Sequence, residues 1–219
     1  MSIILCIETS TTNCSISIGK DNQVLDLKEE NSKSFSHSEQ LHTFIKDLLK
    51  QLSLSMQDLD AISVSKGPGS YTGLRIGVSA AKGLAYALNL PLISVSTLEC
   101  LATQIDIESG LIVPMLDARR MEVYSQIFDS QFNSKRDIKA EILEQDSFSP
   151  ELEANHVHFI GTGVEKFEAI CKHPYAIFHK EKLPSAKEQY FLAKRKFENN
   201  DFEDVAYFEP FYLKDFVSN

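Results

Sequence analysis

The segment from Lys66 to Leu88 constrains the fold more than any other stretch of the chain. A β-branched run, Ala61–Ser65, stops at Gly67-Pro68-Gly69, where glycine permits positive φ and proline fixes its own φ. Ser70 or Thr72 then offers a side-chain oxygen that can cap a helix. The segment therefore predicts a strand, a tight turn and a helix that continues to Leu88.

The turn has two interpretations. Backbone amides at a helix N-terminus can hold phosphate, so a glycine loop after a strand suggests a nucleotide site. This loop has neither the Walker lysine spacing nor the GxGxxG spacing. The sequence therefore favours a structural role for Gly67, Pro68 and Gly69.

The predicted helix carries a stripe of small residues at a spacing of four: Gly73, Gly77, Ala81 and Ala85. Each interior glycine costs about 0.5–1 kcal/mol relative to alanine, so a close approach of another backbone is the expected reason. That backbone could belong to the helix's own sheet or to a second helix. Because the rest of the helix is apolar nearly all round, burial on more than one side is expected.

Composition excludes some functions. The chain has 219 residues and a formal charge of −9, which makes it a poor binder of phosphate backbones by itself. No apolar run is long enough to cross a bilayer, and the N-terminus does not resemble a secretory signal. Four scattered cysteines without metal-binding spacing fit a reduced, cytoplasmic protein.

Periodicity predicts the order β-β-β-α-β-α-β-α for the first half, with an N-terminal antiparallel meander followed by parallel strands. Ser36 and Glu39 have capping-box spacing before an amphipathic helix that extends to Leu52. In the second half we expect strands at 111–116, 121–128 and 157–160, and helices at 164–171 and 186–197. The stretch 130–146 is polar and is expected to end as a loop, and the aromatic tail 207–213 is expected to pack back on the body.

Several motifs together resemble the bacterial TsaB (YeaZ) family. They are Ile7-Glu8-Thr9-Ser10-Thr11, His37-Ser38-Glu39, Lys66 to Gly77, Ala81 to Ala85, and Leu116 to Tyr124 with its Asp-Ala-Arg-Arg core. The resemblance covers the first ~125 residues continuously and is weak beyond them. It implies an α/β protein with the actin-like ATPase (ribonuclease H-like) fold. Two related halves are expected at 1–106 and 107–219, the second of them reduced.

The resemblance implies a non-catalytic dimerisation subunit in the synthesis of N6-threonylcarbamoyladenosine at position 37 of ANN-decoding tRNAs. Its expected partners are the catalytic subunit TsaD and the ATPase TsaE, with tRNA bound indirectly through the complex. Whether the chain forms a homodimer when it is alone is left open by the sequence. The resemblance implies no required cofactor and leaves open whether ATP or ADP binds at the heterodimer interface. No catalytic residue is assigned to this chain.

In the family, pairing goes through the first two helices. This implies an interface made by Leu41, Phe44, Ile45, Leu48, Gly73, Ile76, Gly77, Ala80, Ala81 and Leu84. With the resemblance, the small-residue stripe is expected to face a partner helix rather than its own sheet.

A second group of residues is expected at a cleft between the halves, where it would contact nucleotide or partner: Glu8, Thr9, Ser10, Asp117, Arg119 and Arg120. For the last three, an ion-pair network that fixes a hairpin is the favoured alternative. The family usually has Asp where Glu8 stands, which makes an active nucleotide site less expected here.

Two other functions compete with the subunit hypothesis. A nucleotide-hydrolysing or phosphoryl-transfer enzyme of the same fold could use Glu8, but a second acidic phosphate loop is not apparent in the sequence. A metallopeptidase needs paired histidines on one helix face. His37 and His42 are five residues apart and fall on different faces, so no metal site is expected.

Overall fold

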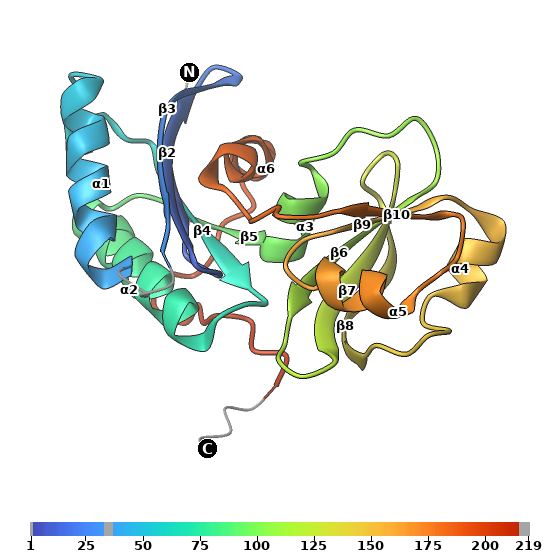
Figure 1. Ribbon diagram of the computed structural model, residues 1–219. Coiled ribbons are helices and arrows are strands. Elements are labelled where there is room, and N and C mark those ends of the chain that lie inside the picture. The colour runs from blue at the N-terminus through green and yellow to red at the C-terminus, as the bar shows by residue number, and fades with distance from the viewer. Residues whose placement is uncertain (1, 33–36, 215–219) are drawn as a thin grey trace. The chain divides into compact units, whose positions relative to one another are not determined.

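The computed structural model describes residues 2–32 and 37–214 (Figure 1). Its contacts divide the chain into two compact units, which are described separately. The first unit comprises Met1–Cys100 and Pro184–Tyr212, and the second comprises Leu101–Leu183 and the chain from Leu213. The units differ from the expected halves 1–106 and 107–219, because the chain returns to the first unit at Pro184.

The first unit contains a five-stranded sheet in the order β3-β2-β1-β4-β5. The antiparallel meander pairs β1 with β2 and β2 with β3, and β4 and β5 continue the sheet parallel to β1. The strand bounds are β1 Ile3–Glu8, β2 Asn13–Lys20, β3 Gln23–Asn31, β4 Ala61–Gly67 and β5 Leu92–Ser96. The expected element order of the first half is therefore confirmed, with a short 3₁₀ turn, η1 Met56–Asp58, added before β4.

Helices cover both faces of this sheet. Helices α1 (His37–Gln51) and α2 (Tyr71–Leu88) lie on one face, and α6 (Ala186–Glu198) lies on the other (Figure 1). The side chains of β1 alternate accordingly: Leu5 and Ile7 pack with α1 and α2, whereas Ile4 and Cys6 pack with α6. This burial on both faces explains why β1 is a continuous apolar run.

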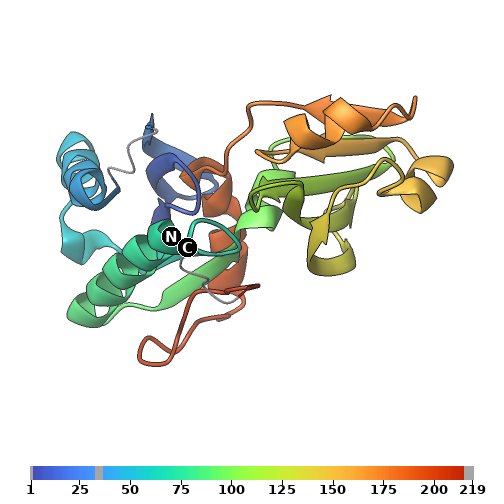
Figure 2. The same cartoon turned by 60° about the horizontal axis from the view of Figure 1, so that its bottom comes forward.

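After α6 the chain runs back beside α2 (Figure 2). The ammonium group of Lys82 donates to the carbonyl oxygens of Ala206 and Phe208, at 3.2 and 2.8 Å. The amide of Phe211 donates to the carbonyl of Lys66 at 2.7 Å, and Phe208 is buried. The aromatic tail therefore packs on the first unit, as the sequence predicted.

The second unit repeats the topology of the first. Its sheet has the order β10-β9-β6-β7-β8, with β6, β7 and β8 antiparallel and β9 and β10 parallel to β6. The strands are β6 Leu111–Asp117, β7 Glu122–Asp129, β8 Ser134–Ile142, β9 Val157–Ile160 and β10 Ala176–His179. The same three-strand meander followed by two parallel strands shows two related halves.

The helices show that the second half is reduced. Those after β8 and β9, α4 (Ser149–Ala154) and α5 (Val164–Ile170), have 6 and 7 residues. Their counterparts α1 and α2 have 15 and 18. A further short helix, α3 (Thr97–Ala102), follows β5. The expected fold class is confirmed.

The sequence did not predict β8, α4 or β10. The stretch 130–146 does end as a loop, after β8 stops at Ile142. Strand β8 is an edge strand with charged residues along much of its length, so its apolar alternation is weak. Strand β10 has only 4 residues. The expected cap of α1, Ser36, lies outside the described residues.

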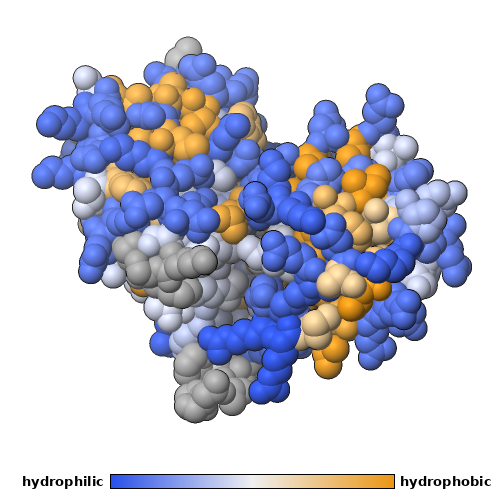
Figure 3. All heavy atoms as spheres, viewed as in Figure 1, coloured by the Kyte–Doolittle hydropathy of each residue, from blue (hydrophilic) through white to orange (hydrophobic). Residues whose placement is uncertain are grey.

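Hydrophilic atoms dominate the face shown in Figure 3, with apolar atoms in separate patches. Large exposed apolar side chains include Tyr86, Ile142 and Tyr207. Among the described residues, no helix is long and apolar enough to cross a membrane.

Candidate functional site

The glycine turn after β4 packs directly on the loop after β1. The amide of Ser70 donates to the carbonyl of Ser10 at 2.6 Å, and Ser70 Oγ caps α2 by accepting from the amide of Gly73 at 3.3 Å. A Cβ atom at Gly69 would lie 2.4 Å from the Ser10 carbonyl oxygen. Gly67 has φ +112°, which favours glycine. Because the Ser70 amide is already paired, it is not free to hold phosphate.

The small-residue stripe of α2 faces the helix's own sheet. A Cβ atom at Gly73 would lie 2.1 Å from the carbonyl oxygen of Thr9, and one at Gly77 would lie 2.2 Å from Thr9 Oγ1. Thr9 Oγ1 in turn donates to the carbonyl of Gly73 at 2.8 Å. Ala81 and Ala85 are buried on the same side. The expectation that the stripe faces a partner helix is therefore corrected, because the loop after β1 occupies that space.

The expected interface residues divide into two sets. Those buried within this chain are Leu41, Ile45, Leu48, Gly73, Gly77 and Ala81. Those that pack on the core yet remain partly exposed are Phe44, Ile76, Ala80 and Leu84. Only the second set presents side chains at the surface, so the surface of α2 differs from the stripe that the sequence emphasised.

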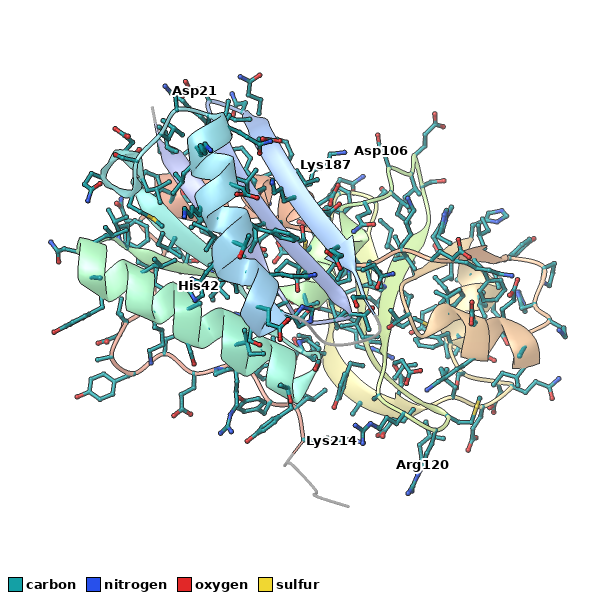
Figure 4. All side chains as sticks on the ribbon, turned by 60° about the vertical axis from the view of Figure 1, so that its left-hand side comes forward. Asp21, His42, Asp106, Arg120, Lys187 and Lys214 are labelled. Atoms are coloured by element: carbon teal, nitrogen blue, oxygen red, sulfur yellow. The ribbon has the colours of Figure 1, made fainter. Side chains whose placement is uncertain are left out.

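The exposed sides of α1 and α2 enclose a groove of ≈ 410 Å³, which we call the helix groove. Figure 4 shows these two helices from the front, with His42 labelled between them. Among the described residues, no Asp, Glu, Lys or Arg lines this groove, whose residues are Ser38, Leu41, His42, Ile76, Ser79, Ala80, Gly83 and Leu84. Sequence analysis missed Ser38, His42, Ser79 and Gly83. The signal available was a second group of small residues on α2, formed by Ser79, Ala80 and Gly83.

Glu8, at the end of β1, is fully buried. Its Oε1 accepts the Ser10 amide at 2.6 Å and the Ser65 hydroxyl at 3.0 Å, while Oε2 accepts no hydrogen bond from the described residues. Burial raises the pKa of this carboxyl; the hydrogen bonds from Ser10 and Ser65 oppose that shift, and the charge of Glu29 adds to it. The carboxyl therefore holds the loop after β1 in place.

We expect a Glu8→Gln variant to be more stable than the parent at pH 8, by at least about 1 kcal/mol. A raised pKa means that the folded state binds this proton more tightly than the unfolded state. The stability that Glu8 contributes is therefore complete at acid pH and is lost as pH rises through the folded-state pKa. Glutamine keeps the oxygen that accepts both hydrogen bonds and removes the ionisation.

Urea unfolding at pH 5 and pH 8 measures this effect, with exposed Glu39→Gln as the control. The difference in the free energy of unfolding between Glu8→Gln and the parent is expected to be smaller at pH 5 than at pH 8. A variant less stable than the parent at pH 8 would show that the charge of Glu8 stabilises the fold.

Asp117, at the end of β6, anchors the turn between β6 and β7. Its Oδ1 accepts the Arg119 amide at 2.6 Å and the ammonium of Lys166 at 2.7 Å. Its own amide donates to Thr162 Oγ1 at 2.9 Å, and Glu122 pairs with Lys214. These contacts within the second unit match the hairpin network that the sequence favoured for this cluster.

Arg119 and Arg120, unlike Asp117, do not take part in this network. Both have positive φ, at 72° and 51°, and both side chains are exposed. Figure 4 shows Arg120 at the tip of the connection between β6 and β7, pointing away from the ribbon. Neither guanidinium forms an ion pair with a carboxylate of the described residues. The two arginines are therefore available for contacts outside the second unit.

The described residues contain no group of three or more His, Cys, Asp or Glu side chains that could hold a metal ion. His37, which the sequence placed in the first turn of α1, is buried, and its Nε2 lies 2.8 Å from the carbonyl of Thr11. The four cysteines are free and buried; burial raises the pKa of Cys6 to about 12 and that of Cys14 to about 11. Low thiol reactivity follows.

The duplicated sheet topology defines the class of the protein: an α/β protein with the actin-like, ribonuclease H-like fold. The family model described as TsaD, tRNA N6-adenosine threonylcarbamoyltransferase, matches residues 31–217. Two solved structures from Pseudomonas aeruginosa cover nearly the whole chain. Because of these matches and the relatives described next, the chain belongs to the TsaB (YeaZ) family.

The relatives support this assignment in detail. The Bacillus subtilis (strain 168) tRNA threonylcarbamoyladenosine biosynthesis protein TsaB is 41% identical over 125 residues, which are 57% of this chain and 54% of that protein. The Escherichia coli (strain K12) protein of the same name is 29% identical over 98% of this chain and 96% of its own length.

Of the two Pseudomonas aeruginosa structures, YeaZ has a TM-score of 0.84 at 27% identity, covering 97% of this chain and 100% of that chain. The other has a TM-score of 0.85 at 26% identity, with 98% and 100% covered, and is described as similar to peptidase YEAZ.

Proposed function

We propose that this protein is a dimerisation subunit in the formation of N6-threonylcarbamoyladenosine at position 37 of ANN-decoding tRNAs. In this role it binds and activates the catalytic subunit TsaD, together with the ATPase TsaE, in the cytoplasm. Membership of the TsaB family and the names of its relatives support the pathway. The observation that carries the subunit role is the helix groove on the surface of α1 and α2.

The helix groove has the chemistry of a protein interface. Ile76, Ala80 and Leu84 give it an apolar α2 side, and Leu41 gives it an apolar floor on the α1 side. Small side chains at Ser79 and Gly83 allow another helix to approach α2 closely. A partner with an apolar helix would remove this surface from water without burying an unpaired charge. TsaD is the proposed partner, and a second copy of this chain would occupy the same surface in its absence.

Two features support a non-catalytic role. Glu8 is buried and engaged with Ser10 and Ser65, and the Ser70 amide is paired with the Ser10 carbonyl. The groups that would hold a nucleotide at the end of β1 are therefore occupied by contacts within the chain. The formal charge of −9 also favours contact with tRNA through the complex rather than through this subunit alone.

The proposal is tested by light scattering on a sizing column and by nucleoside mass spectrometry. We expect a one-to-one complex when the protein is mixed with TsaD of the same organism. We also expect this chain to restore N6-threonylcarbamoyladenosine in the tRNA of a bacterium depleted of its own TsaB. Absence of a complex at micromolar concentration, with both proteins folded, would overturn the subunit role.

A further inference from the structure

Two histidines face each other on the edge of the second sheet, formed by β9 and β10 (Figure 1). His158 of β9 pairs with Ile177 of β10 in the parallel register, and His179 follows Ile177 by two residues. Side chains alternate along a strand, so His158 and His179 project from the same face. His158 Nδ1 lies 2.9 Å from His179 Nε2, and the two rings are within 19° of parallel.

The contact requires at least one neutral ring, because a hydrogen bond between two imidazoles needs one nitrogen that accepts. Both side chains are partly exposed, so an ion can reach them from solvent. The nearby groups that titrate or carry charge are His156 and Lys182, and Lys180 is already paired with Glu168. The pair thus presents two facing nitrogen ligands on two paired strands, at a place that the proposed subunit role does not use.

We propose that His158 and His179 form a two-histidine site for a borderline divalent transition-metal ion such as Zn²⁺. A tetrahedral zinc ion with Zn–N distances of about 2.0–2.1 Å holds its nitrogen ligands roughly 3.3 Å apart. The observed separation is 2.9 Å, and with ring centroids 5.2 Å apart the two nitrogens point at each other along one line. Binding therefore requires both rings to rotate until their lone pairs converge on the ion, and both side chains are partly exposed. When the ion binds, the proton now shared between the facing nitrogens moves to the outer nitrogen of the donor ring, so both rings stay neutral.

The ligand set determines which ions fit. Imidazole nitrogen suits zinc, copper and nickel, whereas magnesium and calcium prefer oxygen ligands. Because the described residues offer no third protein ligand in a metal-binding group, the remaining positions belong to water or to an exogenous donor. The site is therefore open, and its affinity is expected to be modest rather than structural.

Isothermal titration of the full chain with ZnCl₂ tests the proposal, with MgCl₂ as the chemical control. We expect one zinc ion per chain and no magnesium binding. His158→Gln and His179→Gln are each expected to weaken zinc binding by about 10-fold or more. His173→Gln, which removes a partly exposed histidine of the second unit outside the pair, is expected to leave zinc binding unchanged, and circular dichroism verifies that each variant is folded.

A second readout identifies the ligands directly. Zinc is expected to shift the imidazole proton resonances of His158 and His179 in NMR spectra, ahead of those of the other histidines. No binding at millimolar zinc, or equal binding by the parent and both glutamine variants, would overturn the proposal. A hydrogen bond alone would then account for the pair.

Discussion

A Gly73→Ala substitution is expected to destabilise the protein by about 3 kcal/mol, although alanine is the better helix former. The added Cβ would lie 2.1 Å from the carbonyl oxygen of Thr9, a backbone atom that cannot rotate away. Either α2 must move off the sheet, or the Thr9 loop must shift and strain the hydrogen bonds that Glu8 makes with Ser10 and Ser65. Urea unfolding followed by circular dichroism measures the loss.

Gly83→Ala is the matched control, because it makes the same change in the same helix. Gly83 is exposed and has no neighbouring atom within 4 Å of an added Cβ. The variant is expected to gain about 0.5–1 kcal/mol, the usual preference of a helix interior for alanine. If Gly73→Ala lowers the free energy of unfolding and Gly83→Ala raises it, the result supports packing of the buried stripe against the chain's own sheet. A stabilised Gly73→Ala variant would contradict it.

Placing a charge in the helix groove should abolish the complex with TsaD without unfolding the subunit. We expect Ser79→Arg to weaken that complex by about 100-fold or more, because an arginine buried there without an acidic partner costs about 3 kcal/mol. Ser79 is exposed in the free chain and lines the groove, so the change is tolerated until a partner covers it. Light scattering and titration calorimetry with TsaD measure the effect.

Ala87→Arg supplies the matched control for charge. Ala87 is also an exposed residue of α2, but it does not line the helix groove. Its arginine variant is expected to bind TsaD nearly as well as the parent. If Ser79→Arg binds normally, or if both variants fail equally, the partner does not dock in the groove.

These two predictions distinguish two roles of α2, stabilising the fold and binding a partner, which the sequence alone assigned to the same residues. A bulky residue at Gly77 would disrupt the contact with Thr9, so any loss of binding could follow from misfolding. The buried stripe and the second group of small residues on α2 lie on different sides, one holding the fold and the other facing outward. Substitutions at Ser79 and Gly83 therefore test partner binding, whereas those at Gly73 and Gly77 test stability.

Local chemistry was sufficient for much of the fold. The continuous apolar run of β1, the turn at Gly67-Pro68-Gly69 and the periodicity of α1 and α2 each specify one element with few alternatives. Their order indicated a meander followed by parallel strands, because short connections and right-handed crossovers leave few topologies. The edge strands β8 and β10 were missed, since an edge strand needs no strong apolar alternation.

The candidate site depended more on tertiary structure. The sequence by itself determined the family motifs, the first-half topology and the presence of small residues on α2. Only the folded chain decided which way the glycine stripe faces, because helical periodicity shows that residues share a side but not what lies against that side. The return of α6 to the first sheet, the burial of Glu8 and the pairing of His158 with His179 likewise join residues far apart in sequence. Such contacts arise from packing, which no local pattern records.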